Sequence, residues 1–515
     1  MLYRLIILCL FSSSLRAQQP NIIYIMSDDH DADAISAYNK KFISTPNMDR
    51  IAKDGIRFTN CFVGNSICSP VRATVLTGQH SHLNGIKDNR TPFDGTKVTL
   101  PKLLKEAGYQ TVLIGKWHLH SLPTGFDYWT VFPGQGIYYS TRLINMNNDT
   151  IRYNEYATSF VTDQTLDWLR AKRDPGKPFF IMMHHKAPHR NWVPELKWLE
   201  VFSKKTFPEP PTLYADTVGK GTAFKHQRMS ILNDMTLCTD LKIDPQYIMD
   251  IPHLKPDSNE IKSYNAFMNS IPEDQRRRMK EIFAERGKLL QQLKPGGKEL
   301  LKLKYQWYMQ DYLACVASVD ESVGQVLNYL DESGLSENTM VIYTSDQRFY
   351  LGENGWFDKR FMYDVSMQTP LLIKWKGTIK PGTVNTSIVQ NIDFAPTMLD
   401  VAGVKIPGWM QGLSLKPILT SKQNELPRKE LYYRYYEYPI DHYVIPHIGI
   451  REKQYKLIYF YTANEWELYD LKSDPREQKN LIKNPKYKAE INRMKMKLVE
   501  VKNKYKDMEP AGELK

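Results

Sequence analysis

Four short apolar runs, each ending abruptly in polar or charged residues, constrain the fold of this chain more than any other feature. Continuous apolar runs are typical of strands buried on both faces, and helix-like segments lie between or beside them. We therefore predict an α/β fold with helices on both sides of the sheet. In such sheets ligands collect beyond the carboxyl ends of the strands, where the polar residues would lie. The runs are Asn21–Met26 before Ser27-Asp28-Asp29-His30, Val112–Ile114 before Gly115-Lys116-Trp117-His118, Phe179–Met183 before His184-His185, and Val341–Tyr343 before Thr344-Ser345-Asp346.

The length and the change of composition along the chain predict two unequal parts. A chain of 515 residues exceeds the size at which a single hydrophobic core keeps growing. Residues 255–330 are expected to be mainly helical, with a break at Pro295-Gly296-Gly297. After about residue 425, Tyr-rich alternating segments precede a charged helix near 485–506. We expect a large domain over 18–425 and a C-terminal α+β subdomain over 426–515, with an antiparallel sheet and a terminal helix.

The N-terminus is typical of an exported protein. An apolar stretch from Leu5 to Phe11 follows Arg4 and leads to small residues ending near Ala17, which predicts a signal peptide over 1–17. Cys9 offers the alternative of a lipid anchor. No later segment approaches the roughly 18 uninterrupted apolar residues of a transmembrane helix. We expect no transmembrane segment and a periplasmic or secreted mature protein.

Charge and cysteine content narrow the function only slightly. Five cysteines are few for an exported chain of this size, so disulfides are not expected to organise the fold. The formal net charge of +12 favours an anionic partner through long-range attraction. Nucleic acid, an anionic lipid surface and an acidic polysaccharide all satisfy that charge, as does a solvated surface without any partner.

The segment Cys68-Ser-Pro70-Val-Arg72-Ala-Thr-Val-Leu76-Thr-Gly78 is the most specific local pattern. It matches the signature of the formylglycine-dependent sulfatases, whereas a lone cysteine is more often a buried small apolar side chain. The resemblance implies that a maturation enzyme oxidises Cys68 to formylglycine, whose hydrate attacks sulfur. It also implies an alkaline-phosphatase-like mixed sheet sandwiched by helices, and a sulfated carbohydrate rather than nucleic acid as partner.

Two oxygen-bearing pairs are candidate metal ligands. Hydrolysis of a sulfate ester needs a hard cation, and oxygen ligands suit calcium or magnesium. Asp28 with Asp29, and Asp346 with Gln347, each follow a predicted strand, although such pairs alone are more often caps or turns. Together with Cys68 they predict a calcium site.

Several cations and histidines match further family segments. The charge of sulfate requires cations where charge develops, and Arg72, Lys116 and Lys359 are candidates. The resemblance implies that Lys116 holds sulfate, that His118 contacts formylglycine, and that His189, assisted by Lys359, protonates the leaving oxygen. Each of these residues alone is more often structural. The implied catalytic residues are Cys68, Arg72, Lys116, His118, His189 and Lys359.

Two positions depart from the family pattern. Arg348 stands where glycine is common, and Asn354 replaces a frequent histidine, which leaves the local backbone and a neighbouring contact open. Gln347 occupies a position often filled by Asn and keeps the amide oxygen. The departures motivate the alternative of an inactive glycan-binding homologue.

The combined motifs are most similar to bacterial carbohydrate sulfatases of the N-acetylglucosamine-6-sulfatase type. The expected substrate is therefore 6-O-sulfated N-acetylglucosamine of a glycosaminoglycan or related glycan. Alternatives are a 2-O-sulfated uronate, an N-sulfated glucosamine or a marine polysaccharide. A phosphoesterase of the same superfamily would usually present Ser or Thr without the context of Pro70 and Arg72. Candidate sugar-binding residues, each with packing as the alternative role, are Trp192, Trp356, Arg360, His442 and His447.

Overall fold

The computed structural model describes residues 19–216 and 220–514. The predicted signal peptide over 1–17, including Cys9, lies outside these residues. Within the described ranges, no helix has both the length and the apolar character that crossing a membrane requires.

The four apolar runs form four neighbouring strands at the centre of a ten-stranded mixed sheet. Strand β1 pairs in parallel with β8 and with β9, and β8 pairs in parallel with β4, so these strands end at the same edge. On one side β10 pairs antiparallel with β9; on the other side β5 pairs in parallel with β4, and β6 then pairs antiparallel with β5. The order is β11 (Thr383–Asn385), β2 (Ile56–Phe58), β10 (Leu371–Trp375), β9 (Thr339–Ser345), β1 (Asn21–Ser27), β8 (Phe179–His184), β4 (Gln110–Lys116), β5 (Tyr128–Phe132), β6 (Tyr139–Asn145) and β7 (Thr150–Tyr156).

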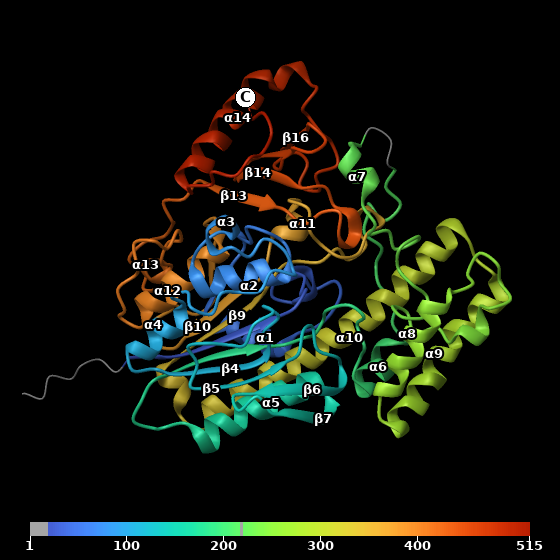
Figure 1. The fold of residues 1–515 in the computed structure, drawn as a ribbon, viewed down its shortest axis with the longest axis horizontal. Coiled ribbons are helices and arrows are strands. Elements are labelled where there is room, and N and C mark those ends of the chain that lie inside the picture. Colours follow the sequence, from blue (N-terminus) through green and yellow to red (C-terminus); the bar gives the residue numbers. More distant parts are fainter. Residues whose placement is uncertain (1–18, 217–219, 515) are drawn as a thin grey trace, which may run out of the picture.

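Helices cover both faces of this sheet, as predicted (Figure 1). Side chains alternate along a strand, so Ile23 and Ile25 of β1 join one core while Ile22, Tyr24 and Met26 join the other. The first core includes residues of α1 (Pro46–Lys53), α5 (Ala157–Asp167) and α10 (Gly297–Glu332), and the second includes residues of α2 (Cys68–Thr77), α4 (Leu100–Glu106) and α12 (Phe394–Val401).

The Lys- and Glu-rich segment forms the helical lobe at the right of Figure 1. Its helices α8 (Ser258–Ser270) and α9 (Glu273–Leu293) precede α10, and Pro295 and Gly296 separate α9 from α10, where the sequence predicts a break. Met279 and Phe283 of α9 join the core that contains α10. The shorter elements are β3 (Cys61–Phe62), α3 (Ser81–Asn84), α6 (Leu196–Phe202), α7 (Thr222–His226), α11 (Asp364–Met367), β12 (Val389–Gln390) and α13 (Lys416–Leu419).

The C-terminal part is a four-stranded antiparallel sheet beside the large sheet. One face packs on α14 (Lys488–Lys504), where Met494 and Leu498 share a core with Ile448. Tyr433 and Phe460, on the other face, join the core that contains α2. The small sheet therefore packs in the same core as the helix that begins at Cys68. Its strands are β13 (Glu430–Tyr435), β14 (His447–Glu452), β15 (Tyr455–Phe460) and β16 (Glu465–Asp470).

Candidate active site

Three carboxylates meet where β1 and β9 end. Asp28 and Asp29 follow β1, Asp346 follows β9, and Ser27 pairs with Ser345 in the parallel register. The backbone N–H of Asp29 donates to Asp346 Oδ1 at 3.0 Å. One oxygen from each of the three carboxylates lies within 4.8 Å of the other two, and all three side chains are fully buried. The strand register thus brings together acids more than 300 positions apart in the chain.

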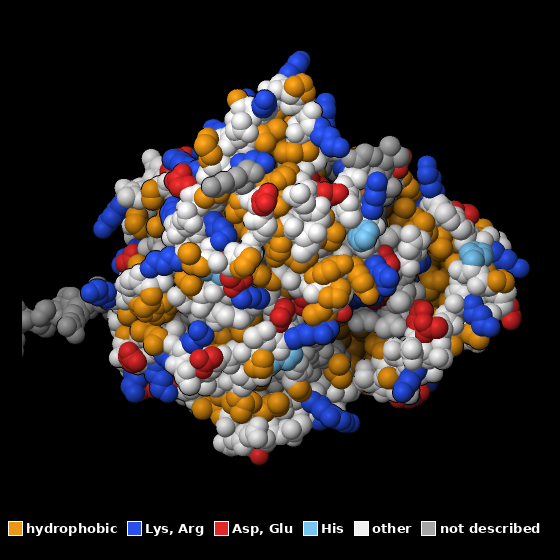
Figure 2. Space-filling model, turned by 45° about the horizontal axis from the view of Figure 1, so that its top comes forward, with side chains coloured by type: hydrophobic (Ala, Val, Ile, Leu, Met, Phe, Trp, Pro, Cys, Tyr) orange, Lys and Arg blue, Asp and Glu red, His pale blue; other side chains and the backbone are white. Residues whose placement is uncertain are grey.

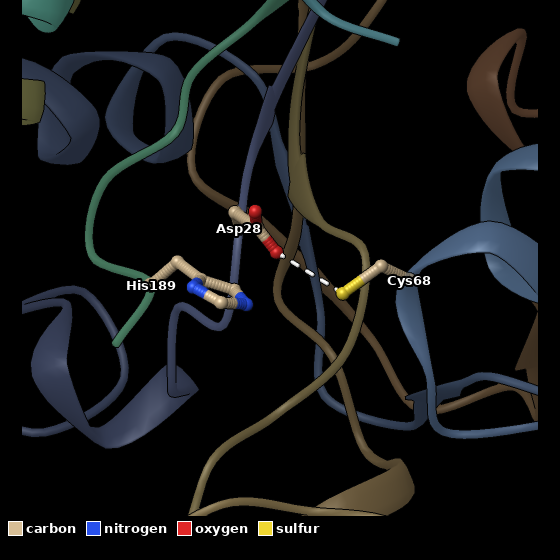
Figure 3. A group of neighbouring side chains, drawn as sticks. All are labelled: Asp28, Cys68 and His189. Atoms are coloured by element: carbon tan, nitrogen blue, oxygen red, sulfur yellow. Dashed lines mark hydrogen bonds between the residues drawn. The ribbon is translucent and has the colours of Figure 1, made fainter. Parts of the chain in front are cut away.

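Cys68 reaches the same point from the opposite side, at the first residue of α2 (Figure 3). Its Sγ lies 3.5 Å from Asp28 Oδ1 and 3.6 Å from Gln347 Nε2. Burial, followed by the negative charge of Asp28, raises the pKa of the Cys68 thiol far above its usual value. The unmodified thiol is therefore a poor nucleophile in this position. The N-terminus of α2 also directs backbone N–H groups and the positive end of the helix dipole toward this site, which favours an anion.

Three buried cations surround the carboxylates, and each pairs with a different one. Their charges balance, so a bound divalent ion would give this group of six a net positive charge that attracts sulfate. The pairs are Lys116 Nζ with Asp28 Oδ2, Arg72 Nη2 with Asp346 Oδ2 at 3.0 Å, and Lys359 Nζ with Asp29 Oδ2 at 2.7 Å.

Gly115 explains locally how Lys116 is placed. Its φ is +102°, a conformation that L side chains rarely adopt. A Cβ on Gly115 would lie 1.9 Å from the carbonyl oxygen of His184 on the neighbouring strand β8. Only glycine therefore allows β4 and β8 to approach this closely immediately before Lys116.

The oxygen donors fit a hard divalent cation. Gln347 Oε1 is buried and accepts no hydrogen bond from the described residues. Burial, followed by the negative charge of Asp28, raises the pKa of Asp346 to about 7, and burial also raises the pKa of Asp29. A cation would relieve this repulsion. Carboxylate and amide oxygens are the ligands that calcium prefers, so Asp28, Asp29, Asp346 and Gln347 suit such an ion.

Two histidines lie near Cys68: His189 offers an atom within 4.8 Å of Cys68 Sγ, and His118 contacts Ser69, the next residue. His189 Nε2 lies 3.7 Å from Asp29 Oδ2, and its side chain is 15% exposed, in contrast to the fully buried carboxylate. His118 Nδ1 lies 3.4 Å from Ser69 Oγ. Burial, followed by Lys116 and Arg72, lowers the pKa of His118, so this imidazole is neutral. The structure thus brings the six predicted catalytic residues together; their individual roles stay predictions.

Three of the five candidate sugar-binding residues lie in the core, which corrects the prediction. Trp192 is fully buried with its ring 4.6 Å from that of Tyr308, and Trp356 packs 4.3 Å from Phe224. His447 is fully buried, and its Nε2 accepts from the N–H of Met362 at 3.1 Å. Sequence motifs do not distinguish an aromatic residue at the site from one packed behind it.

The other two candidates, Arg360 and His442, share a partner that the sequence analysis missed. Asp358 Oδ1 accepts from Arg360 Nε at 2.9 Å, and Asp358 Oδ2 lies 3.2 Å from His442 Nε2. Arg360 Nη1 also donates to Glu437 Oε2. Asp358 immediately precedes Lys359, and this adjacency is the signal that could have identified it. The cluster offers carboxylate, guanidinium and imidazole groups beside Lys359.

The two departures from the family pattern form bonds outside the carboxylate cluster. Arg348 Nε donates to Asp31 Oδ2 at 2.5 Å, and Arg348 Nη2 pairs with Asp33. Asn354 lies in the left-handed region with φ +59° and accepts from Gln478 Nε2 at 2.9 Å. Neither substitution disrupts the arrangement around Cys68.

Comparisons with known proteins agree with this geometry. The profile of the sulfatase family matches residues 20–404, and that of the "N-sulphoglucosamine sulphohydrolase, C-terminal" family matches residues 352–504. The chain is 45% identical over 500 residues to N-acetylglucosamine-6-O-sulfatase of Bacteroides thetaiotaomicron, covering 96% of this chain and 88% of that protein. It is 24% identical to human N-acetylglucosamine-6-sulfatase, covering 82% of this chain and 69% of the human protein.

Solved structures show the same architecture. One, described as a complex with its substrate D-glucosamine-2-N,6-O-disulfate, superposes with a TM-score of 0.91 at 44% identity, covering 96% of this chain and 99% of the other. A phosphonate monoester hydrolase from Silicibacter pomeroyi superposes with a TM-score of 0.67 at 19% identity, covering 95% and 96% of the two chains. The second likeness indicates a shared fold alone.

Proposed function

This chain belongs to the sulfatase family, and on that premise we propose that it removes the 6-O-sulfate of an N-acetylglucosamine or glucosamine residue in a glycosaminoglycan or related glycan. The convergence of Cys68, two oxygen-bearing pairs and three buried cations at one point is the observation that carries the proposal. The name of the 45% identical relative and the disulfated glucosamine in the 44% identical structure support the choice of sugar.

Two groups absent from the polypeptide as translated complete the proposed site. Asp28, Asp29, Asp346 and Gln347 would hold calcium, and Cys68 would be converted to formylglycine by a maturation enzyme. When present, calcium polarises sulfate oxygens and the hydrated aldehyde supplies a nucleophilic oxygen. The buried unpaired Gln347 Oε1 and the raised pKa of Asp346 support the metal.

The remaining side chains bind charge and move protons. Arg72 and Lys116 neutralise sulfate oxygens as charge develops, which is an electrostatic role. We assign protonation of the departing sugar oxygen to His189 Nε2 with help from Lys359. Burial lowers the pKa of His189, and Lys359, whose pKa is raised by Asp29 despite burial, is the group that holds a proton before the reaction. We assign the acceptance of a proton to His118, which lies beside Ser69.

Asp358, Arg360 and His442 form the proposed sugar contact. Their bonds to one another hold the polar groups in fixed positions, because each of the three side chains is mostly buried. Sugar hydroxyl groups both donate and accept, so a carboxylate beside a guanidinium and an imidazole suits them. These residues would set which hydroxyl pattern is accepted.

Sulfate release from a panel of defined sugars tests the function. Enzyme co-expressed with a formylglycine-generating enzyme should release sulfate from 6-sulfated N-acetylglucosamine faster than from 2-O-sulfated uronate or N-sulfated glucosamine. Mass spectrometry of the peptide around Cys68 should detect the aldehyde. Binding without turnover on the whole panel would instead favour an inactive homologue, and phosphate release without an aldehyde would favour a phosphoesterase.

The predicted location stays a proposal as well. We propose export to the periplasm or beyond, on the basis of the N-terminal sequence of residues 1–17. Fractionation of cells that express the full chain tests it, since a protein retained in the cytoplasm with an uncleaved N-terminus would contradict export.

A further inference from the structure

A second concentration of positive charge lies away from Cys68, in what we call the hairpin groove. This hollow of 580 Å³ lies between the β6–β7 hairpin and α8, at the lower right of Figure 1. On the face in Figure 2, Lys and Arg side chains lie among acidic ones. None of the described lining residues is Asp or Glu, and those that matter here are Gln135, Arg142, Arg152 and Asn269.

Two arginines in the hairpin groove face each other without a counter-ion. Arg142 of β6 and Arg152 of β7 are direct partners in the antiparallel register, so their side chains extend from the same face of the sheet. Both are exposed. In the described chain, neither guanidinium forms an ion pair or a hydrogen bond. Like charges directly opposite destabilise a pair of strands, and an anion between them would remove that repulsion.

The hairpin groove adjoins the segment that holds His189. Lys186 Nζ donates to the carbonyl oxygen of Gln135 at 3.3 Å and lies 5.1 Å from the ring centre of Tyr138. Tyr138 OH in turn donates to the carbonyl oxygen of His189 at 2.6 Å. Lys186 is buried and has no carboxylate partner among residues 19–216 and 220–514, so it adds positive charge on the path from His189 to the arginines.

The other groove at α8 differs in charge. This pocket of 480 Å³ is bordered by His189 itself and by Asp240, Asp257 and Glu260. Arg190 offsets only Asp240, with which it forms two bonds of 2.7 Å. The pocket is therefore net acidic and would repel a negatively charged saccharide. Of the two grooves beside α8, the hairpin groove is therefore the one whose charge suits an anionic saccharide.

We propose that the hairpin groove binds a second anionic group of the glycan, either a carboxylate or a further sulfate on an attached saccharide, between Arg142 and Arg152. This subsite rests on the proposed sulfatase function and extends it from a single sugar to an acidic oligosaccharide. The planar guanidinium groups suit bidentate contacts with either anion.

Direct binding of desulfated products tests the subsite without turnover. The probes are disaccharides in which terminal N-acetylglucosamine is linked to glucuronate, to 6-sulfated galactose or to galactose, titrated into the calcium-loaded mature enzyme. We expect about tenfold tighter binding of an anionic probe than of the neutral one, falling to near parity in Arg142→Gln/Arg152→Gln. The first two probes separate a carboxylate from a sulfate as the preferred group.

A matched variant controls for net charge. Lys483→Gln/Lys486→Gln removes two exposed positive charges from the C-terminal part and should keep the preference. Equal affinity for all three probes in the unmodified enzyme, or an equal loss for the neutral probe in the arginine variant, would overturn the subsite. Sulfate release from the 6-sulfated monosaccharide is measured in parallel: if no protein releases it, the proposed function fails, while the binding ratios still decide on the groove.

Discussion

The site around Cys68 and the hairpin groove both contain several positive charges, but only those around Cys68 are paired with carboxylates. Around Cys68, each of three buried cations pairs with its own carboxylate. In the hairpin groove, two exposed arginines oppose each other with no partner in the described chain. Internal pairing fixes charges in position, so removing one disturbs both fold and chemistry. Unpaired exposed charges do not stabilise the fold, so their removal should leave it intact.

The largest expected effect comes from Cys68→Ala. Loss of the nucleophile should lower kcat by at least about 10³-fold, measured as sulfate release. Cys238→Ala removes another buried cysteine outside the site and is the matched control. Full activity of Cys68→Ala would refute the proposed chemistry. The Cys68 site would then no longer differ from the hairpin groove as the place of reaction.

Asp346→Asn should disturb metal binding and folding together. Losing a ligand should weaken calcium binding by more than about 100-fold. The substitution also removes the closer of the two carboxylates that pair with the buried Arg72, which should cost about 3 kcal/mol of unfolding free energy. Metal content and urea unfolding measure the two effects.

Removal of the metal gives an independent check on Asp346→Asn. Chelation should lower the stability of the unmodified enzyme, and calcium at about 100 times its Kd should restore roughly 2.7 kcal/mol. The metal site would be contradicted if the chelator left the unfolding curve unchanged and if the unmodified enzyme and Asp346→Asn contained the same amount of metal.

His442→Ala and His447→Ala should separate a residue at the site from one in the core. His442→Ala should lower kcat/KM about tenfold, because it removes the proposed polar contact to the sugar, and should cost about 1 kcal/mol of unfolding free energy, because Asp358 Oδ2 loses its partner while Asp358 Oδ1 keeps Arg360. His447→Ala should cost about 3 kcal/mol of unfolding free energy, because it leaves a cavity and strips the N–H of Met362 of its acceptor. Reversed outcomes would return His447 to the sugar site.

The smallest effect concerns stability in the hairpin groove. Arg142→Gln/Arg152→Gln should raise the unfolding free energy by roughly 0.5 kcal/mol, because it removes a like-charge pair. Urea unfolding at low salt measures this, and high salt should shrink the difference. If the unfolding free energy fell by several kcal/mol instead, the arginines would stabilise the hairpin. They would then contribute to the fold, as the paired cations around Cys68 do.

The central sheet could be predicted from sequence because burial on both faces leaves uninterrupted apolar runs. The polar residues after those runs meet at one edge because the strands are parallel, but joining Asp28 and Asp346 in one site also needed the pattern around Cys68. The pattern around Cys68 supplied the position of the nucleophile. Local periodicity and local motif were sufficient for these features.

The prediction of sugar contacts was wrong for Trp192, Trp356 and His447. Whether such a side chain faces the site or the core depends on the direction of its loop or strand. An aromatic ring fits a sugar site and a protein core equally well, and only the packing partners decide. Asp358 and the pairing of Arg142 with Arg152 were missed for the related reason that hydrogen-bond partners and hairpin register depend on tertiary contacts. Sequence motifs therefore identify the reacting groups more readily than the surfaces that select a substrate.

The complete burial of Cys68 sets an order of events in the making of the enzyme. A side chain without exposed surface cannot enter the catalytic cleft of another protein. The oxidation that we propose must therefore precede folding, while this stretch of chain is still extended. A molecule that folds before this proposed oxidation would keep its thiol, so the fraction of competent enzyme would depend on how fast oxidation is relative to folding.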